Sequence, residues 1–116
     1  MVATVATDVL AQIAARYRFR GEGVPEAVTE AGTQVAALLL EAGDQIVAYF
    51  GPEPTLVLEF FISLDEDDEP GKLYGLIQTK LDPDQAVPIM DRWLRQWWVK
   101  ELQRGEGRLN FDIEYV

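Results

Sequence analysis

The sequence contains no cysteine and no histidine, and Ser63 is its only serine. Without cysteine, the chain can form neither disulfides nor thiolate-ligated zinc sites. Histidine is the commonest general base and metal ligand, so its absence leaves Ser63 without the usual activating partner. Any catalysis would have to use carboxylates, lysine, tyrosine or a metal ion held by oxygen ligands. These absences disfavour an enzyme, and we expect no cofactor.

Positive charge is also scarce. The chain has 10 lysine and arginine residues against 20 aspartate and glutamate residues, which gives a formal net charge of -10. Affinity for nucleic acids and for anionic membranes comes largely from basic side chains, so neither is an expected partner. A basic protein partner fits this charge, although solubility alone is the simpler explanation.

Long apolar runs are missing as well. No run approaches the length of about 20 residues that spans a bilayer. Residues 1–20 lack the basic start and unbroken apolar core of a signal peptide, and we expect a cytoplasmic protein. Hydrophobic residues make up 48% of the 116 residues, which predicts one globular domain over residues 1–116.

Two helices are predicted in the first part of the chain. Apolar residues recur at helical spacing over 4–18, and again from Pro25 up to Gly43, which suits the position just past a helix end. Arg16, Arg18 and Arg20 close the first helix. They either complement the helix dipole or form a binding patch on an otherwise acidic protein.

Strands are predicted next. Residues 45–50 suit a strand or a longer helix, and we choose a strand because a Gly-Pro-Glu-Pro turn follows. Alternating patterns predict strands over 55–64 and 72–81, joined by the acidic loop 65–69, and a last half-buried strand over 108–116. The acidic loop lacks the glycine and glutamate spacing of an EF-hand calcium loop, so a solvated loop is favoured.

A helix with three tryptophans fills the space before the last strand. Asp82 is a good N-cap and Pro83 suits the first turn, whereas Pro88 predicts a kink or two short pieces. Trp93 and Trp97 fall on the apolar face. Trp98 lies about 140° around an α-helix from Trp93, near the edge of the apolar face. It is therefore the best candidate of the three for partial exposure and for anchoring a partner, and packing on the sheet is the alternative.

These elements follow the order α-α-β-β-β-α-β. That order predicts an α+β fold with a mostly antiparallel three- to four-stranded sheet and helices packed on one face.

The last third of the chain resembles a set of small bacterial proteins without a known activity. Residues 81–99 read Leu-Asp-Pro-Asp-Gln-Ala-Val-Pro-Ile-Met-Asp-Arg-Trp-Leu-Arg-Gln-Trp-Trp-Val, and 112–115 read Asp-Ile-Glu-Tyr. The Asp-Arg-aromatic step, the Trp-Trp pair and the Asp-x-Glu-aromatic tail carry the resemblance. It covers residues 81–116 and implies no function.

The leading functional hypothesis is a small acidic, non-enzymatic protein-interaction domain of adaptor, accessory or inhibitor type. Its partner would be another protein or a second copy, giving a homodimer through an exposed helix or sheet edge. The candidate binding residues are Trp98, Arg16 and Arg18.

The alternative hypothesis is a divalent-metal-dependent hydrolase or nuclease-like protein. Glu59, Asp112 and Glu114 fall on one face of the predicted sheet, where they could ligate a metal ion beside Lys80. An exposed polar face, with Lys80 in a cross-strand ion pair, is the simpler interpretation of the same residues.

Overall fold

The computed structural model describes residues 6–62, 71–105 and 107–116. An α+β fold with a four-stranded sheet is confirmed. The elements, in chain order, are α1 (Thr7–Arg16), β1 (Tyr17–Arg20), α2 (Val24–Ala31), α3 (Thr33–Phe50), β2 (Thr55–Phe61), β3 (Lys72–Thr79), α4 (Pro83–Trp93), the π-helix η1 (Leu94–Trp98), α5 (Val99–Gly105) and β4 (Leu109–Tyr115).

The sheet is mixed, so the prediction of a mostly antiparallel sheet is wrong. Its strand order is β1-β2-β3-β4, and only the central β2–β3 pair is antiparallel. β1 runs parallel to β2, and β3 runs parallel to β4. Parallel neighbours need a long crossover connection, which α2 and α3 supply for the first pair and the α4–η1–α5 segment for the second.

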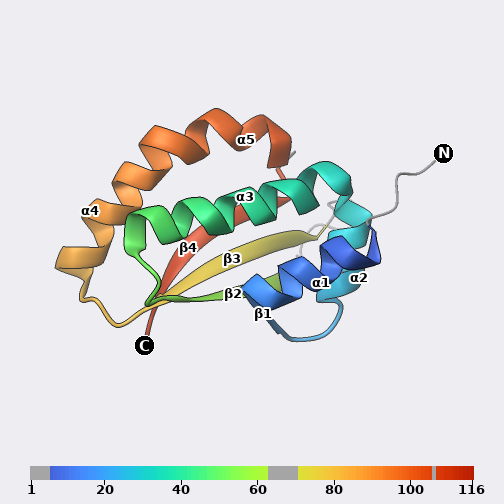
Figure 1. The fold of residues 1–116 in the computed structure, drawn as a ribbon, viewed down its shortest axis with the longest axis horizontal. Coiled ribbons are helices and arrows are strands. Elements are labelled where there is room, and N and C mark those ends of the chain that lie inside the picture. Colours follow the sequence, from blue (N-terminus) through green and yellow to red (C-terminus); the bar gives the residue numbers. More distant parts are fainter. Residues whose placement is uncertain (1–5, 63–70, 106) are drawn as a thin grey trace.

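The core lies between the helices and one face of the sheet. Figure 1 shows α3 and the arched α4–α5 ribbon over the sheet. The strand residues buried on this face are Tyr17, Leu56, Leu58, Leu73, Ile77, Thr79 and Leu109. The opposite face, which we call the open face, carries Glu59, Asp112 and Glu114, because residues at alternate positions of a strand share a face.

The first strand replaces the end of the predicted first helix. α1 ends at Arg16, and Tyr17 opens β1 opposite Leu56. The sequence Tyr-Arg-Phe-Arg alternates, so Tyr17 and Phe19 contribute to the core while Arg18 and Arg20 point to the open face. The helix-dipole explanation of the three arginines therefore applies only to Arg16.

The second predicted helix is two helices, and the predicted strand at 45–50 is wrong. Gly32, with φ of 100°, separates α2 from α3. α3 then continues through Gly43 to Phe50, because buried Leu39, Ala42 and Ile46 keep one helical face in the core. Gly51, with φ of 81°, follows the helix end.

The helical segment before β4 starts as predicted and continues through Pro88. The Asp82 carboxylate accepts a 3.1 Å hydrogen bond from the N–H of Gln85, which caps α4. Instead of dividing at Pro88, the segment changes to a π-helix at Leu94. No helix among the described residues has both the length and the apolar character needed to cross a membrane.

Candidate functional site

The tryptophans belong to the core, and the expected exposure of Trp98 is wrong. Trp98 is 6% exposed and stacks on the fully buried Trp93, with ring centroids 5.8 Å apart and planes within 9°. The i→i+5 bonding of a π-helix brings residues five apart toward one face, which α-helical spacing does not do. Phe111 packs edge-on against both indoles. Trp97 is the half-buried member of the three.

Arg16 and Arg18 line one side of a broad open groove of about 740 Å³. Arg16 forms an ion pair with Asp44, which joins α1 to α3. Arg18 is exposed on the open face of β1. The other lining residues include Val47, which is 44% exposed, and Pro54 before β2. This groove holds both arginines, but Asp44 already balances the charge of Arg16.

The three carboxylates of the metal hypothesis share a face but do not converge on one point. Arg20 donates from Nε to Glu59 Oε2 at 2.9 Å and from Nη1 to Glu114 Oε1 at 2.8 Å. A guanidinium therefore lies between the two glutamates. The Asp112 carboxylate instead accepts a 2.8 Å hydrogen bond from the N–H of Ile113.

Within the described ranges, no three acidic side chains are grouped closely enough to hold a metal ion. Lys80 is exposed and contributes no hydrogen bond to either glutamate. The acidic segment 65–69, expected to be a solvated loop, lies outside the described residues.

The hydrogen bond from Arg20, supported by one from Gln78 Nε2 at 2.6 Å, lowers the pKa of Glu114 to about 2. A hydrogen bond to the charged form of a carboxylate favours that form. Glu114 therefore stays ionised at neutral pH, whereas a general acid or base needs a pKa near the operating pH.

The sequence patterns do not show which strands form the edges of the sheet. Among the described strands, β4 has β3 as its only neighbour. The N–H of Leu73 donates to the carbonyl of Arg108, and the N–H of Val116 donates to the carbonyl of Thr79. Because backbone groups alternate along a parallel pair, the even-numbered residues of β4 bond to β3. The odd-numbered residues direct their backbone groups outward; they are Leu109, Phe111, Ile113 and Tyr115.

We call these outward backbone groups the β4 edge. The N–H of Ile113 provides independent support for this direction, because it is bonded to the side chain of Asp112 and not to β3. The alternation of β4 could be predicted from the sequence. Its place at the edge of the sheet depends on strand order, which no local sequence pattern indicates.

A groove runs beside the β4 edge, between α4 and β4. It has a volume of about 260 Å³, and we call it the α4–β4 groove. Its lining residues are Val87, Met90, Asp91, Leu94, Asp112, Ile113 and Tyr115. Val87 is 53% exposed and Tyr115 is 45% exposed, so apolar surface remains open on both walls. A strand edge beside side-chain pockets is the arrangement used for binding extended peptides.

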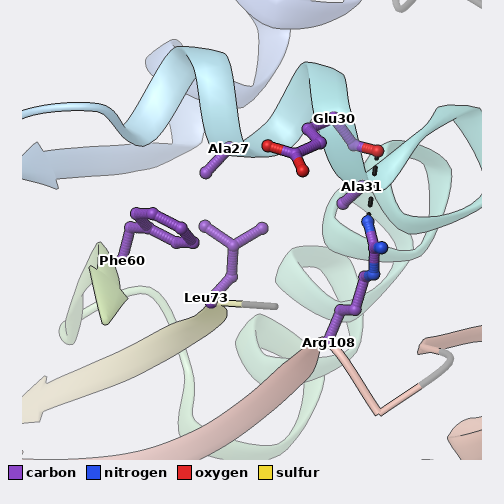
Figure 2. Close-up of a pocket in the computed structure, with 7 residues that line it drawn as sticks. Ala27, Glu30, Ala31, Phe60, Leu73 and Arg108 are labelled. Atoms are coloured by element: carbon purple, nitrogen blue, oxygen red, sulfur yellow. Dashed lines mark hydrogen bonds between the residues drawn. The ribbon is translucent and has the colours of Figure 1, made fainter. Parts of the chain in front are cut away.

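A third, smaller pocket lies at the start of β4 (Figure 2). Ala27, Phe60 and Leu73 form its apolar wall, and its volume of about 20 Å³ has room for roughly one water molecule. Arg108 Nη1 donates a 3.2 Å hydrogen bond to the carbonyl of Glu30, which ties the start of β4 to α2. Because of its small volume, this pocket has no room for a ligand larger than water.

Comparison of the chain with models of known protein families, with curated proteins and with solved structures gave no match.

Proposed function

We propose that this protein is a non-enzymatic interaction domain that binds another polypeptide through the β4 edge and the α4–β4 groove. The observation that carries the proposal is the position of unpaired backbone groups beside an open apolar groove. Backbone hydrogen bonds supply affinity in such a site, and side-chain contacts supply selectivity. An adaptor, an accessory protein or an inhibitor would each act by binding of this kind.

No specific observation favours the metal-dependent hydrolase. Glu59 and Glu114 are both bonded to Arg20, and Asp112 is bonded to the backbone of its own strand. A metal ion would have to displace the guanidinium and rotate Asp112 before the three carboxylates could share it. Binding is therefore the better-supported class of function.

Selection from a random seven-residue peptide display library tests the proposal. The length matches the seven residues of β4. Peptides enriched on the wild-type protein are then measured against Val87→Lys, which places a long charged side chain on the wall of the α4–β4 groove. Val47→Lys is the matched control, because Val47 is also a helical valine and is 44% exposed, but it lines the other groove.

We expect enriched peptides to lose at least tenfold in affinity for Val87→Lys and to bind Val47→Lys like the wild type. Ligands that bind both variants equally would overturn the proposed site, as would loss confined to Val47→Lys. Circular dichroism of both variants checks that each is folded.

A further inference from the structure

The two sides of the β4 edge present different chemistry to an added strand. Successive side chains of a strand point to opposite faces of the sheet. Alternate residues of a fifth strand would therefore face Val87 and Leu94 in the α4–β4 groove. The residues between them would lie on the open face, beside Asp112 and near Glu114 on the same strand.

The charge on the open side of this edge is negative. Asp112 is exposed and makes no ion pair among the described residues. On the other side, Asp91 forms only an exposed pair with Arg95, at 3.2 Å. The whole chain carries a net charge of -10. Opposite charges on directly paired strand positions stabilise a sheet, and like charges destabilise it.

A second copy of β4 is a poor occupant for this reason. Antiparallel pairing centred on Asp112 would place the two copies of Asp112 opposite each other. Pairing centred on Ile113 would place Asp112 opposite Glu114, and pairing centred on Phe111 would place Asp112 opposite Asn110. None of these arrangements gives Asp112 a positive partner, and the net charge of each copy adds repulsion.

Asp112 also controls one of the outward backbone groups. Its carboxylate occupies the N–H of Ile113, which a fifth strand would need as a donor. A lysine or arginine opposite Asp112 would attract that carboxylate away from the backbone and release the N–H. Basic side chains therefore supply both a charge partner and access to a backbone hydrogen bond.

We infer that the β4 edge binds an extended partner segment in which basic side chains alternate with apolar ones, added as a fifth strand. The inference rests on the proposed function and names the chemistry of the partner. Apolar side chains of the segment enter the α4–β4 groove, and its basic side chains lie beside Asp112.

Synthetic peptides of seven residues test this inference. The probe is Lys-Val-Lys-Val-Lys-Val-Lys, with blocked ends, titrated into isotope-labelled protein at physiological ionic strength. The first control has the same composition in the order Lys-Lys-Val-Val-Val-Lys-Lys, which keeps the charge and removes the alternation. The second control carries backbone N-methyl groups at alternate residues, and the third replaces lysine by glutamate.

We expect the alternating peptide to bind at least tenfold tighter than the reordered peptide and to shift the amide signals of Leu109, Phe111, Ile113 and Tyr115. The N-methyl control consists of two peptides, each methylated at one of the two alternating sets of positions. The peptide whose methyl groups lie on the edge that meets β4 should not bind. The glutamate peptide should not bind. Asp112→Asn should weaken binding of the alternating peptide by about fivefold, and Asp84→Asn, an exposed acid in the first turn of α4, should not.

Equal binding of the two lysine peptides would overturn the inference, because it would show attraction to net charge alone. A concentration-dependent dimer in sedimentation experiments, abolished by Tyr115→Pro, would assign the edge to a second copy and also overturn it. If library peptides depend on Val87 but are neutral or helical, the proposed function stands and this inference fails. If library peptides bind Val87→Lys as tightly as the wild type, the proposed function itself fails.

Discussion

Arg20 and Glu114 join the two edge strands of the sheet across a sequence separation of 94 residues. Nη1 of Arg20 lies 2.8 Å from Oε1 of Glu114, and Nη2 lies 2.9 Å from Oε2. The same guanidinium also bonds Glu59 of β2. One side chain from β1 thus holds carboxylates from β2 and β4, in the paired geometry that suits arginine.

The Arg20–Glu114 contact predicts a specific dependence of stability on pH. The folded-state pKa of Glu114 is about 2, below its ordinary value of 4.5. The stabilisation it provides is therefore fully present above pH 4.5 and is lost as the pH falls through about 2. Glu114→Gln should lower the free energy of unfolding at pH 7, and the difference from wild type should shrink between pH 4.5 and 2.

Urea denaturation at a series of pH values measures this effect. Glu53→Gln is the control, since Glu53 is exposed in the segment before β2. A Glu114→Gln difference that is constant from pH 7 to 2 would contradict the assignment of the pKa shift to Arg20.

Two glycine substitutions should act in opposite directions. Gly43 lies inside α3, and an added Cβ would be 3.4 Å from Nη1 of the flexible Arg16 side chain. Gly43→Ala should therefore stabilise the protein by about 0.5–1 kcal/mol, the usual helix-propensity gain.

At Gly75 an added Cβ would lie 2.3 Å from the Phe111 ring. Gly75→Ala should destabilise by about 1–3 kcal/mol.

Urea denaturation measures the free energy of unfolding of both variants and of the wild type, with one common dependence on urea concentration fitted to all three. A destabilised Gly43→Ala would mean that Arg16 cannot move aside without losing its ion pair with Asp44. A neutral Gly75→Ala would show that the Phe111 ring shifts at little cost.

Acrylamide quenching should identify Trp97 as the accessible tryptophan. Trp97 is half-buried, whereas Trp98 is buried against Trp93. Trp97→Phe should reduce the quenching of the remaining fluorescence, and Trp98→Phe should leave the quenched fraction unchanged or higher. The reverse result would mean that Leu94–Trp98 is an ordinary α-helix in solution.

Trp93→Phe should lower the free energy of unfolding by less than the burial of the indole suggests. Trp93 is fully buried, and its Nε1 has no hydrogen-bond partner among the described residues. The substitution removes an unsatisfied polar group together with apolar contacts, so we expect a loss below about 2 kcal/mol. Trp93→Ala should cost about 3–5 kcal/mol, because it opens a cavity. A Phe variant as unstable as the Ala variant would show that Nε1 is satisfied.

Local chemistry explains which parts of the fold could be predicted. Asp82 and Pro83 start α4 through capping contacts within one turn, and the alternation in β2, β3 and β4 reflects side-chain burial within each strand. The strand predicted over 45–50 is wrong because a short apolar run suits either a strand or a helix, and the turn that follows does not distinguish them. The helix is selected by the packing of Ile46 in the core, which is a tertiary contact.

The missed features depend on contacts between distant segments or on an irregular helix. Parallel pairing of β1 with β2 follows from where α2 and α3 return the chain, and a four-residue strand gives a weak pattern. α-Helical spacing predicts the wrong position for Trp98, because Leu94–Trp98 is a π-helix. The candidate site also depends on contacts between distant segments. The alternation of β4 is a local pattern, but β4 has a free edge only because of the strand order.

The strand order also has a consequence for the folding rate. Neighbours in the sheet are successive strands along the chain, but only β2 and β3 are joined without a helical crossover, so we expect this pair to form before the two parallel pairs. The contact between Arg20 and Glu114 is different, because it requires both edge strands to be in place. We therefore expect it to form after the rate-limiting step. Glu114→Gln should then accelerate unfolding and leave the rate of folding nearly unchanged, so that this ion pair acts on the lifetime of the native state.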